Sequence, residues 1–344
     1  MKEIVLAIDA MGGDHGPSVT VPAAFSLLSR QASIKLILVG DQEILNTKIA
    51  AFDAKLKERV TIKHASQQVL MDELPSKALR NKKDSSMRVA INLVKDKTAE
   101  ACVSAGNTGA LMATARFVLK TLPGIDRPAI TTLFPTMIPN KGTYVLDLGA
   151  NVDSDSNQLY QIAIMGSVLA SLVDNIKRPK VALLNIGSED NKGNQQIKEV
   201  AQILSESKHI NYVGFVEGDD IFKGNVDVIV CDGFIGNVML KSIEGVLKLV
   251  AFYAKKNMTH SIFTKILALL ALPILKKMYK DINPGKYNGA TFIGLHGTVI
   301  KSHGGADIDA FTYALEKAVV EARRQIPQKI SDELTKILQS SALS

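Results

Sequence analysis

Residues 101–117, ACVSAGNTGALMATARF, contain the pattern that decides the fold. An apolar run leads into the small polar residues of SAGNTG, and an apolar stretch with helical character follows. Short unalternating apolar runs are typical of strands that are covered on both faces, and a helix after each strand implies a crossover to a parallel neighbour. The stretch therefore predicts one strand–turn–helix unit of a parallel sheet.

The same arrangement recurs along the chain. Six further apolar, β-rich runs end in Gly, Asp, Asn or Ser, and most of them precede a helical pattern; they span residues 3–14, 34–42, 143–151, 180–190, 210–220 and 227–237. This repetition predicts an α/β fold with a doubly wound, mainly parallel sheet. Ligands of such sheets bind outside the carboxyl ends of the strands, so we expect the polar loops that follow the strands to meet at one edge.

The bulk composition is that of an ordinary globular protein. The 344 residues allow two domains or one large α/β unit, and we interpret residues 1–344 as a single catalytic domain. The formal net charge of +7 favours an acidic partner, such as nucleic acid, an anionic membrane or an acidic protein or substrate. Asp9 comes too early for a signal-peptide core, so we expect a cytosolic protein. Cys102 and Cys231 lie in apolar runs, which fits buried reduced thiols.

Residues 250–290 depart from this pattern. Residues 261–280, SIFTKILALLALPILKKMYK, are almost wholly apolar between lysines, but Ile266 to Leu275 are too few to cross a bilayer, and Pro273 is expected to kink or end a helix. One interpretation is a buried core or dimer-interface helix. The other is a projecting helical hairpin whose apolar tip touches a membrane while its lysines meet anionic headgroups. The expected membrane contacts are Ile266, Leu267, Leu270 and Ile274.

Several familiar chemistries lack their sequence patterns. The first strand is not followed by Gly-x-Gly-x-x-Gly, and the chain contains no P-loop, no Gly-x-Ser-x-Gly and no His-Glu-x-x-His. None of the six histidines begins a His-x4-Asp pattern, and no Cys/His cluster has metal-ligand spacing. Dinucleotide binding, ATP use, hydrolase triads and zinc chemistry all lose support, and we expect no metal and no cofactor.

What remains is the set of polar loops. In SAGNTG, residues 104–109, glycine lets main-chain N–H groups turn inward at a helix start that Asn107 or Thr108 can cap, and the positive end of the helix dipole favours an anion there. AMGGDHG adds two glycines and His15 after the first strand. One such loop is an ordinary βα turn, but five at one edge predict a binding site. The other loops contribute Asn151, Glu189, Lys192, Asp232 and Asn237.

A basic stretch precedes the SAGNTG loop. Residues 75–95, PSKALRNKKDSSMRVAINLVK, are either a solvated face or a landing patch for an acidic partner. We expect Lys82, Lys83 and Arg88 to meet that partner.

Taken together, these motifs resemble a known family. DAMGGDHGP, KKDSSMRVAI, SAGNTGALMA, DLGAN, NIGSED, CDGFIGNV and HGTVIKSHG are similar to motifs of the bacterial phosphate acyltransferases of phospholipid synthesis, in the same order. The resemblance covers nearly the whole chain. It departs at SHGGAD, where Gly304 and Gly305 stand in place of the hydroxyl residues that are common in the family.

The resemblance implies a fold like that of isocitrate and isopropylmalate dehydrogenases, shared with phosphotransacetylases, and a homodimer. It implies transfer of a long-chain fatty acyl group from acyl carrier protein to inorganic phosphate. It also implies peripheral association with the inner face of the cell membrane, and delivery of the acyl phosphate to a membrane glycerol-phosphate acyltransferase. Nucleic acid is not an expected partner.

The residues suit such a reaction. Phosphate near neutral pH is largely a dianion, and a thiol with a pKa of about 8.5 leaves as a thiolate, so neither a metal nor a triad is required. The protein must hold two anionic substrates together and stabilise a tetrahedral oxyanion, with each donor contributing about 3 to 4 kcal/mol.

We therefore assign candidate roles. The expected phosphate cradle comprises Ser104, Gly106, Asn107, Thr108 and Gly109. The candidate catalytic residues are His15, Asn151, Lys192, Asn237 and Asp232. Lys192 is the expected countercharge; the histidine and the two asparagines are candidate oxyanion donors or leaving-group acids. Asp232 fits an orienting or capping role better than that of a base, and Asp14 and Asp147 are equally compatible with ordinary turns.

Three alternatives remain open. Cys102 or Cys231 could accept the acyl group covalently, although buried strand cysteines are usually inert. The chain could be a short-chain phosphotransacetylase that acts on coenzyme A, which the apolar segment 262–278 disfavours. It could also be a membrane scaffold, which would leave the polar loops without a role.

Overall fold

The computed structural model describes residues 3–282 and 288–341. In these residues a sheet of eleven strands has the order β3-β2-β1-β4-β11-β10-β5-β6-β9-β7-β8. The strands are β1 (Ile4–Asp9), β2 (Ile34–Gly40), β3 (Val60–His64), β4 (Ala101–Ser104), β5 (Ala129–Pro135), β6 (Gly142–Leu146), β7 (Lys180–Leu184), β8 (Asn211–Val216), β9 (Val228–Val230), β10 (Ala290–Ile293) and β11 (Thr298–Lys301). The large, mostly parallel sheet confirms the predicted α/β class, and each of the seven predicted runs contains a strand.

Helices connect most of these strands. They are α1 (Pro17–Arg30), α2 (Gln42–Ile49), α3 (Ala54–Lys57), α4 (Pro75–Asn81), α5 (Ser86–Lys95), α6 (Thr108–Leu119), α7 (Ser156–Asp174), α8 (Gln195–Glu206), the 3-10 helix η1 (Gly218–Phe222), α9 (Gly233–Met258), α10 (Ile262–Ile282), α11 (Ile308–Arg324) and α12 (Ile326–Ser341). Many begin at a side-chain cap that follows a strand, because the cap accepts a hydrogen bond from an otherwise unpaired N–H group. These caps include Asp41, Asn107, Asp155, Asn194, Asp232 and Asp307.

Helices cover both faces of the sheet. Successive residues of β1 point to opposite faces: Leu6 and Ile8 pack with α1 and α11, whereas Ala7 packs with α5 and α6. In the other half, α7, α8 and α12 cover one face, and α9 packs Leu240 and its neighbours against the other. Full burial of one large apolar side chain contributes about 1.5 to 3 kcal/mol, so this double covering stabilises the strands that carry the loops.

The sheet changes direction in its middle. β1, β4 and β11 are parallel to one another, but β5 and β6 form an antiparallel pair, and β9, β7 and β8 follow the direction of β6. The carboxyl ends of β6, β9 and β7 therefore lie at the edge opposite to those of β1 and β4. The prediction that all five polar loops share one edge is wrong, because the β5–β6 hairpin reverses the chain.

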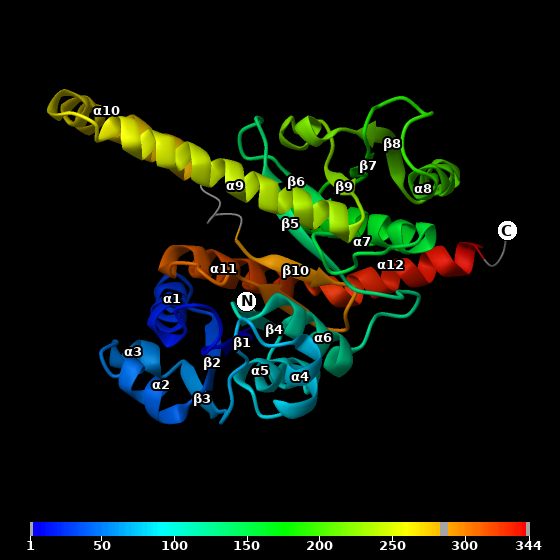
Figure 1. The fold of residues 1–344 in the computed structure, drawn as a ribbon. Coiled ribbons are helices and arrows are strands. Elements are labelled where there is room, and N and C mark those ends of the chain that lie inside the picture. Colours follow the sequence, from blue (N-terminus) through cyan, green and yellow to red (C-terminus); the bar gives the residue numbers. More distant parts are fainter. Residues whose placement is uncertain (1–2, 283–287, 342–344) are drawn as a thin grey trace.

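The predicted helical protrusion is formed by α9 and α10. Figure 1 shows α9 running out from the sheet, with α10 at its far end. Of the predicted range 250–290, residues 283–287 lie outside the described part of the chain. α10 does not end at Pro273, since it continues to Ile282. None of the helices in the described ranges is both long enough and apolar enough to span a bilayer.

The apolar side chains of this hairpin are not part of the chain's own core. The predicted membrane contacts are 53% exposed at Ile266, 48% at Leu267, 72% at Leu270 and 73% at Ile274. Val246 on α9 is also exposed. A buried core helix within one chain is thereby excluded, whereas a dimer interface and a membrane contact both remain compatible with this surface.

Candidate functional site

The carboxyl ends of β1, β4 and β11 meet at one edge of the sheet. Asp9, Ser104 and Lys301 end these strands and lie in register across them. The loops that follow are joined by main-chain hydrogen bonds: the Asp14 N–H donates to the Gly304 carbonyl over 2.9 Å. Three sequence-distant loops, AMGGDHG, SAGNTG and SHGGAD, thus form one structure, which we call the first edge.

Glycine is required where these loops touch. A Cβ atom on Gly12 would lie 2.5 Å from Asp9 Oδ2 and 2.9 Å from the Gly106 nitrogen, and one on Gly13 would lie 2.8 Å from Ala105 Cβ. Gly13 also has a φ of 88°, which side chains disfavour. The two glycines of AMGGD therefore allow the β1 loop to pack directly on the SAGNTG loop.

The polar groups of SAGNTG divide into two sets. Ser104 and the Gly106 N–H bond within the chain: the Ser104 hydroxyl donates to Asp9 Oδ2 over 2.6 Å and accepts from the Gly106 N–H over 3.0 Å. Asn107 caps α6 through the Ala110 N–H, at 2.9 Å. The first N–H groups of a helix lack intrahelical partners, so those of Thr108 and Gly109, two exposed residues, are the ones placed to bind an anion.

Asp9 is a buried acid at this edge. It is 1% exposed, and burial raises its pKa above the ordinary value despite the bond from Ser104 and the nearby Ser86 hydroxyl and N–H groups of Met11 and Gly12. The Ser104 hydroxyl is the hydrogen-bond donor to Oδ2, while Oδ1 has no hydrogen-bond partner among the described residues. A buried carboxylate with a free oxygen is costly, which makes a purely structural role unexpected.

Lys301 is a buried base at the same edge. Its Nζ donates to the Ala105 carbonyl over 3.2 Å and also to the Ser302 carbonyl. Burial lowers its pKa to about 8, against the charges of Asp14 and Asp9 and together with that of Lys241 on α9. The first edge therefore holds a positive charge beside the start of α6, where an anion is favoured.

A segment of residues 66–74, which we call the strap, lies against this edge. Asn107 Nδ2 donates to the Met71 carbonyl over 2.7 Å, and Gln68 Nε2 donates to the Met11 carbonyl over 2.6 Å. A Cβ on Gly304 would lie 2.8 Å from Met71 Cε. The strap thus touches all three loops of the first edge.

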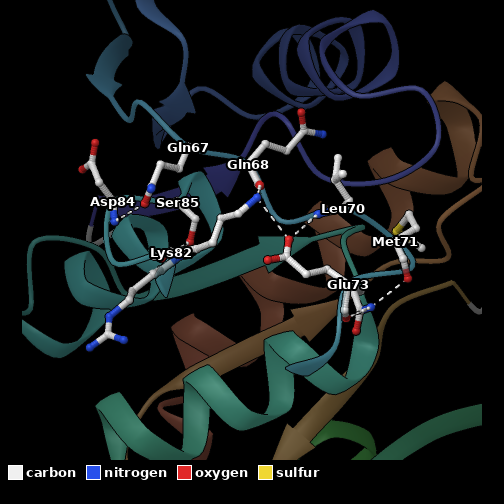
Figure 2. A network of polar contacts seen from close by, with 10 residues as sticks. Gln67, Gln68, Leu70, Met71, Glu73, Lys82, Asp84 and Ser85 are labelled. Atoms are coloured by element: carbon white, nitrogen blue, oxygen red, sulfur yellow. Dashed lines mark hydrogen bonds and ion pairs between the residues drawn. The ribbon is translucent and has the colours of Figure 1, made fainter. Parts of the chain in front are cut away.

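The predicted docking residues do not form one exposed cluster. Figure 2 shows the Lys82 side chain reaching the strap, where its Nζ lies 3.1 Å from Glu73 Oε2 and donates to a main-chain carbonyl. Arg88 donates to the carbonyl of a residue in α4 and lies over the Phe117 ring, 5.2 Å from its centroid. Lys83 is exposed. Of the three cations, only Lys83 presents its charge mainly to solvent.

The opposite edge, which we call the second edge, contains Asp147 and Asn151 after β6. The Asp147 carboxylate accepts from the N–H groups of Ile130 (2.9 Å), Ala150 (3.1 Å) and Asn151 (2.8 Å), and from Asn151 Nδ2 (2.9 Å). Asn151 Nδ2 also donates to the Pro128 carbonyl over 2.8 Å. Burial still raises the pKa of Asp147. These two side chains are occupied in holding the turn.

The other candidate catalytic residues are divided between the two edges. Asp232 caps α9 through the Phe234 N–H, at 2.8 Å, which agrees with the capping role considered for it. Asn237, one turn into α9, and Lys192, in the loop after β7, are exposed at the second edge. His15 is exposed at the first edge. The structure therefore places His15 in the loop that packs on SAGNTG, whereas the other four candidates follow strands that end at the second edge.

The covalent alternative loses support from the cysteines. Cys102 and Cys231 are both buried, and burial raises the pKa of each thiol well above its ordinary value, which disfavours the thiolate nucleophile. Within the described ranges, no three His, Cys, Asp or Glu side chains gather closely enough to hold a metal ion.

Sequence reasoning missed Asp9 and Lys301 as candidates. Both are charged residues that end otherwise apolar runs, IVLAID and TVIK. A charge at the end of a strand that is covered on both faces is expected to be buried beside the loops. The position of a charged residue at the end of a strand was therefore the sequence signal for both residues. For Lys301 the signal points to this site only once β11 is known to lie next to β4.

Known proteins resemble this chain over its length. The model of a family described as fatty acid synthesis protein matches residues 4–329. The phosphate acyltransferase of Nitrosococcus oceani is 60% identical over 331 residues, 96% of each chain, and that of Hydrogenovibrio crunogenus is 55% identical over 338 residues, 98% of this chain and 99% of its own. A phosphotransacetylase structure from Streptococcus pyogenes shares the fold, with a TM-score of 0.62 at 16% identity over 93% of this chain and 94% of that one. The chain belongs to the phosphate acyltransferase family.

Proposed function

We propose that the chain transfers a long-chain fatty acyl group from the thioester of acyl carrier protein to inorganic phosphate at the first edge. The observation that carries this choice of site is the exposed start of α6 beside the buried cation Lys301. Helix N–H groups and a nearby positive charge together favour a phosphate dianion. The relatives are named phosphate acyltransferases, and transfer of an acyl group to phosphate is the reaction that this name describes.

The reaction is an acyl substitution. A phosphate oxygen attacks the thioester carbon, the new C–O bond forms, and the C–S bond then breaks. The proton of the hydrogen phosphate ends on the carrier thiol, so no external acid or oxidant is consumed. In this assignment Thr108 and Gly109 hold phosphate through N–H groups, and Ser104, Gly106 and Asn107 hold the loop. His15 is the proposed oxyanion donor.

Lys192 and Asn237 keep proposed roles at a distance from phosphate. Both are exposed at the second edge, and Lys241 on α9 lies close enough to Lys301 to influence its pKa. α9 therefore connects the two edges, and side chains near its start are available to the arm that carries the thioester. We propose them as donors to that arm rather than as phosphate ligands.

An assay with purified components tests the reaction. The protein is mixed with palmitoyl-carrier protein and phosphate, without ATP or added metal, and acyl phosphate is trapped with hydroxylamine. We expect phosphate-dependent hydroxamate, and far less from acetyl coenzyme A. Turnover of acetyl coenzyme A alone would favour a short-chain phosphotransacetylase, and no turnover with vesicle binding would favour a scaffold.

The carrier protein is proposed to dock beside the strap. Lys83 is exposed there together with Lys77 and Arg80 on α4, and these cations suit an acidic partner. Exchanging Lys83 for Glu should raise KM for the acyl carrier about threefold to tenfold and leave KM for phosphate unchanged, since rim charges mainly affect association. Lys95→Glu, the same charge change at the exposed end of α5, is the matched control. Equal changes in both KM values would reject this surface.

The hairpin is proposed to pair with a second copy and to rest on the inner face of the cell membrane, in the cytoplasm. Its exposed apolar side chains need a cover in water, and Ile266, Leu267, Leu270 and Ile274 are the proposed lipid contacts. From there the acyl phosphate would pass to a membrane glycerol-phosphate acyltransferase. Ile266→Asp with Leu267→Asp should abolish flotation with phosphatidylglycerol vesicles, whereas Val246→Asp should weaken dimerisation in light scattering. Unchanged flotation would contradict the membrane contact.

A further inference from the structure

A continuous chain of hydrogen bonds joins the two buried charges of the first edge. The Ser104 hydroxyl donates to Asp9 Oδ2 over 2.6 Å, and the Gly106 N–H donates to the Ser104 oxygen over 3.0 Å. The carbonyl of the same peptide unit, that of Ala105, accepts from Lys301 Nζ over 3.2 Å. The peptide between residues 105 and 106 is therefore held at both ends, on one side by an acid and on the other by a base.

The polarity of this chain is consistent along its length. A peptide unit carries a dipole with its positive end at N–H and its negative end at C=O. Here the N–H points through Ser104 to the carboxylate of Asp9, and the C=O points to the ammonium of Lys301. Successive bonds that are aligned in this way in a low-dielectric interior polarise and strengthen one another. The arrangement fixes the peptide more firmly than an uncharged chain would.

This peptide lies directly before the N–H groups assigned to phosphate. It precedes Thr108 by two residues, and Met87 Cε would lie 2.7 Å from a Cβ on Gly106, so the turn has little room to rotate. The side chains of Asp9, Ser104 and Lys301 are only 0 to 8% exposed, and therefore they act on a ligand through the loop. Rotation of the 105–106 peptide would redirect the start of α6.

We propose that Asp9, Ser104 and Lys301 are positioning residues that clamp the 105–106 peptide and so orient the N–H groups of Thr108 and Gly109 toward phosphate. The inference rests on the proposed function for the identity of the anion.

The clamp depends on pH at its basic end. The pKa of Lys301 is lowered to about 8, mainly by burial. The charged groups around it are Asp14 and Asp9, which favour its ammonium, and Lys241 of α9, which opposes it. A lysine is protonated below its pKa, so the clamp is complete below about pH 8 and loses its cation as the pH rises through that value. Affinity for phosphate should fall over the same interval.

The test uses three variants and two matched controls in the full-length protein. Ser104→Ala removes the hydroxyl that links Asp9 to the Gly106 N–H. Asp9→Asn keeps an acceptor but removes the charge, and Lys301→Met removes the base. Lys317→Met and Glu321→Gln are the controls. Lys317, which is half-buried, donates to the Gly289 carbonyl over 2.7 Å, and the buried Glu321 accepts from Thr291 Oγ1 over 2.6 Å, so both hold their charges in bonds outside the three loops of the first edge.

We expect KM for phosphate to rise roughly tenfold in Ser104→Ala and Lys301→Met, and less in Asp9→Asn, while KM for the acyl carrier changes less than about twofold. The alkaline decline in phosphate affinity should disappear in Lys301→Met. Combining Asp9→Asn with Lys301→Met should have less effect than the product of the two single changes. Equal rises in the controls at similar thermal stability, or an unchanged KM for phosphate in folded Ser104→Ala, would overturn the clamp.

Calorimetric titration with inorganic phosphate alone separates this inference from the proposed reaction. If the wild-type protein binds phosphate and the variants do not, the clamp stands even where no acyl transfer is detected. The wild-type titration at several pH values needs no variant, and an affinity that stays constant from pH 7 to pH 9 would reject the role of Lys301.

Discussion

Asp9 and Asp147 occupy corresponding places at the two edges of the sheet but differ in how they are satisfied. Each follows or ends a buried strand, each is nearly or fully buried, and burial raises the pKa of each. Asp147 accepts hydrogen bonds from four N–H groups. Asp9 accepts one short bond, from Ser104, has the Ser86 hydroxyl and the N–H groups of Met11 and Gly12 nearby, and keeps Oδ1 without a close partner among the described residues. A fully bonded carboxylate is sufficient as a turn former. The incompletely bonded one indicates a role beyond the turn.

The two edges also differ in whether their loops are closed or leave a helix start exposed. At the second edge the turn after β6 is closed on itself, and α9 packs against it so closely that a Cβ on Gly236 would lie 1.9 Å from the Asp147 carbonyl oxygen. At the first edge the loops are joined to each other and leave the start of α6 exposed. Stability should therefore be most sensitive at the second edge, and phosphate affinity at the first.

The largest expected effect is that of Gly236→Ala. The added methyl group would collide with main chain that cannot move without displacing α9, so we expect a loss of more than about 3 kcal/mol in the free energy of unfolding. Gly245→Ala is the control within the same helix, because its Cβ would meet open space; it should stabilise the protein by up to about 1 kcal/mol. Urea unfolding measures both. Similar midpoints for the two variants would break the comparison.

Asp147→Ala is expected to come next. It leaves three main-chain N–H groups and one amide without their acceptor, which should lower the free energy of unfolding by about 2 to 3 kcal/mol. The variant should retain the wild-type KM for phosphate when it is assayed below its unfolding temperature. A selective rise in that KM would mean that the second edge also binds phosphate.

Asp9→Asn should show a pH-dependent effect. Because burial raises the pKa of Asp9 above its unfolded value of 3.8, the folded wild-type protein binds more protons than the unfolded chain above that pH, and its stability declines as the pH rises through the raised pKa. The variant lacks this decline, so its stability relative to wild type should increase from pH 4 to pH 7. Urea titrations across this interval provide the measurement, and a relative loss of stability at pH 7 would contradict the raised pKa of Asp9.

The smallest expected effect concerns the strap of the first edge. Lys82→Met removes the contact with Glu73, whose side chain is 17% exposed, and this should lower the free energy of unfolding by about 1 kcal/mol or less. Lys83→Met, the change at the neighbouring exposed lysine, should leave thermal stability unchanged. Equal losses for the two would show that the strap is not held by Lys82.

The sequence predicted more of the fold than of the site. The seven strands that carry long apolar runs were identified, because strands covered on both faces need continuous apolar residues. The sheet reversal was not, although PNKG before β6 has the composition of a hairpin turn and Asn140 takes a φ of 59° there. Strands such as β3, whose residues alternate in exposure, gave a weaker pattern.

The site was harder to predict for a different reason. SAGNTG was correctly expected to follow a strand and to begin a helix capped by Asn107. Which of its donors bond within the chain depends on partners such as Asp9 and Met71, and these come close only in the folded protein. Composition cannot distinguish a donor that holds a loop from one that is free for a ligand.

The length of α9 has a consequence for where the reaction takes place. Its 26 residues form a rod of about 39 Å, because each helical residue rises about 1.5 Å. Its first part packs on the sheet as far as Ile243, so residues 244–258 project by about 22 Å. If the far end rests on a bilayer and the rod stands upright, the sheet is held about 2 nm above the headgroups, while the surface potential decays over about 8 Å at physiological salt. The substrates would then meet in bulk electrolyte, and the acylated product would need a sheltered path down the rod to reach lipid.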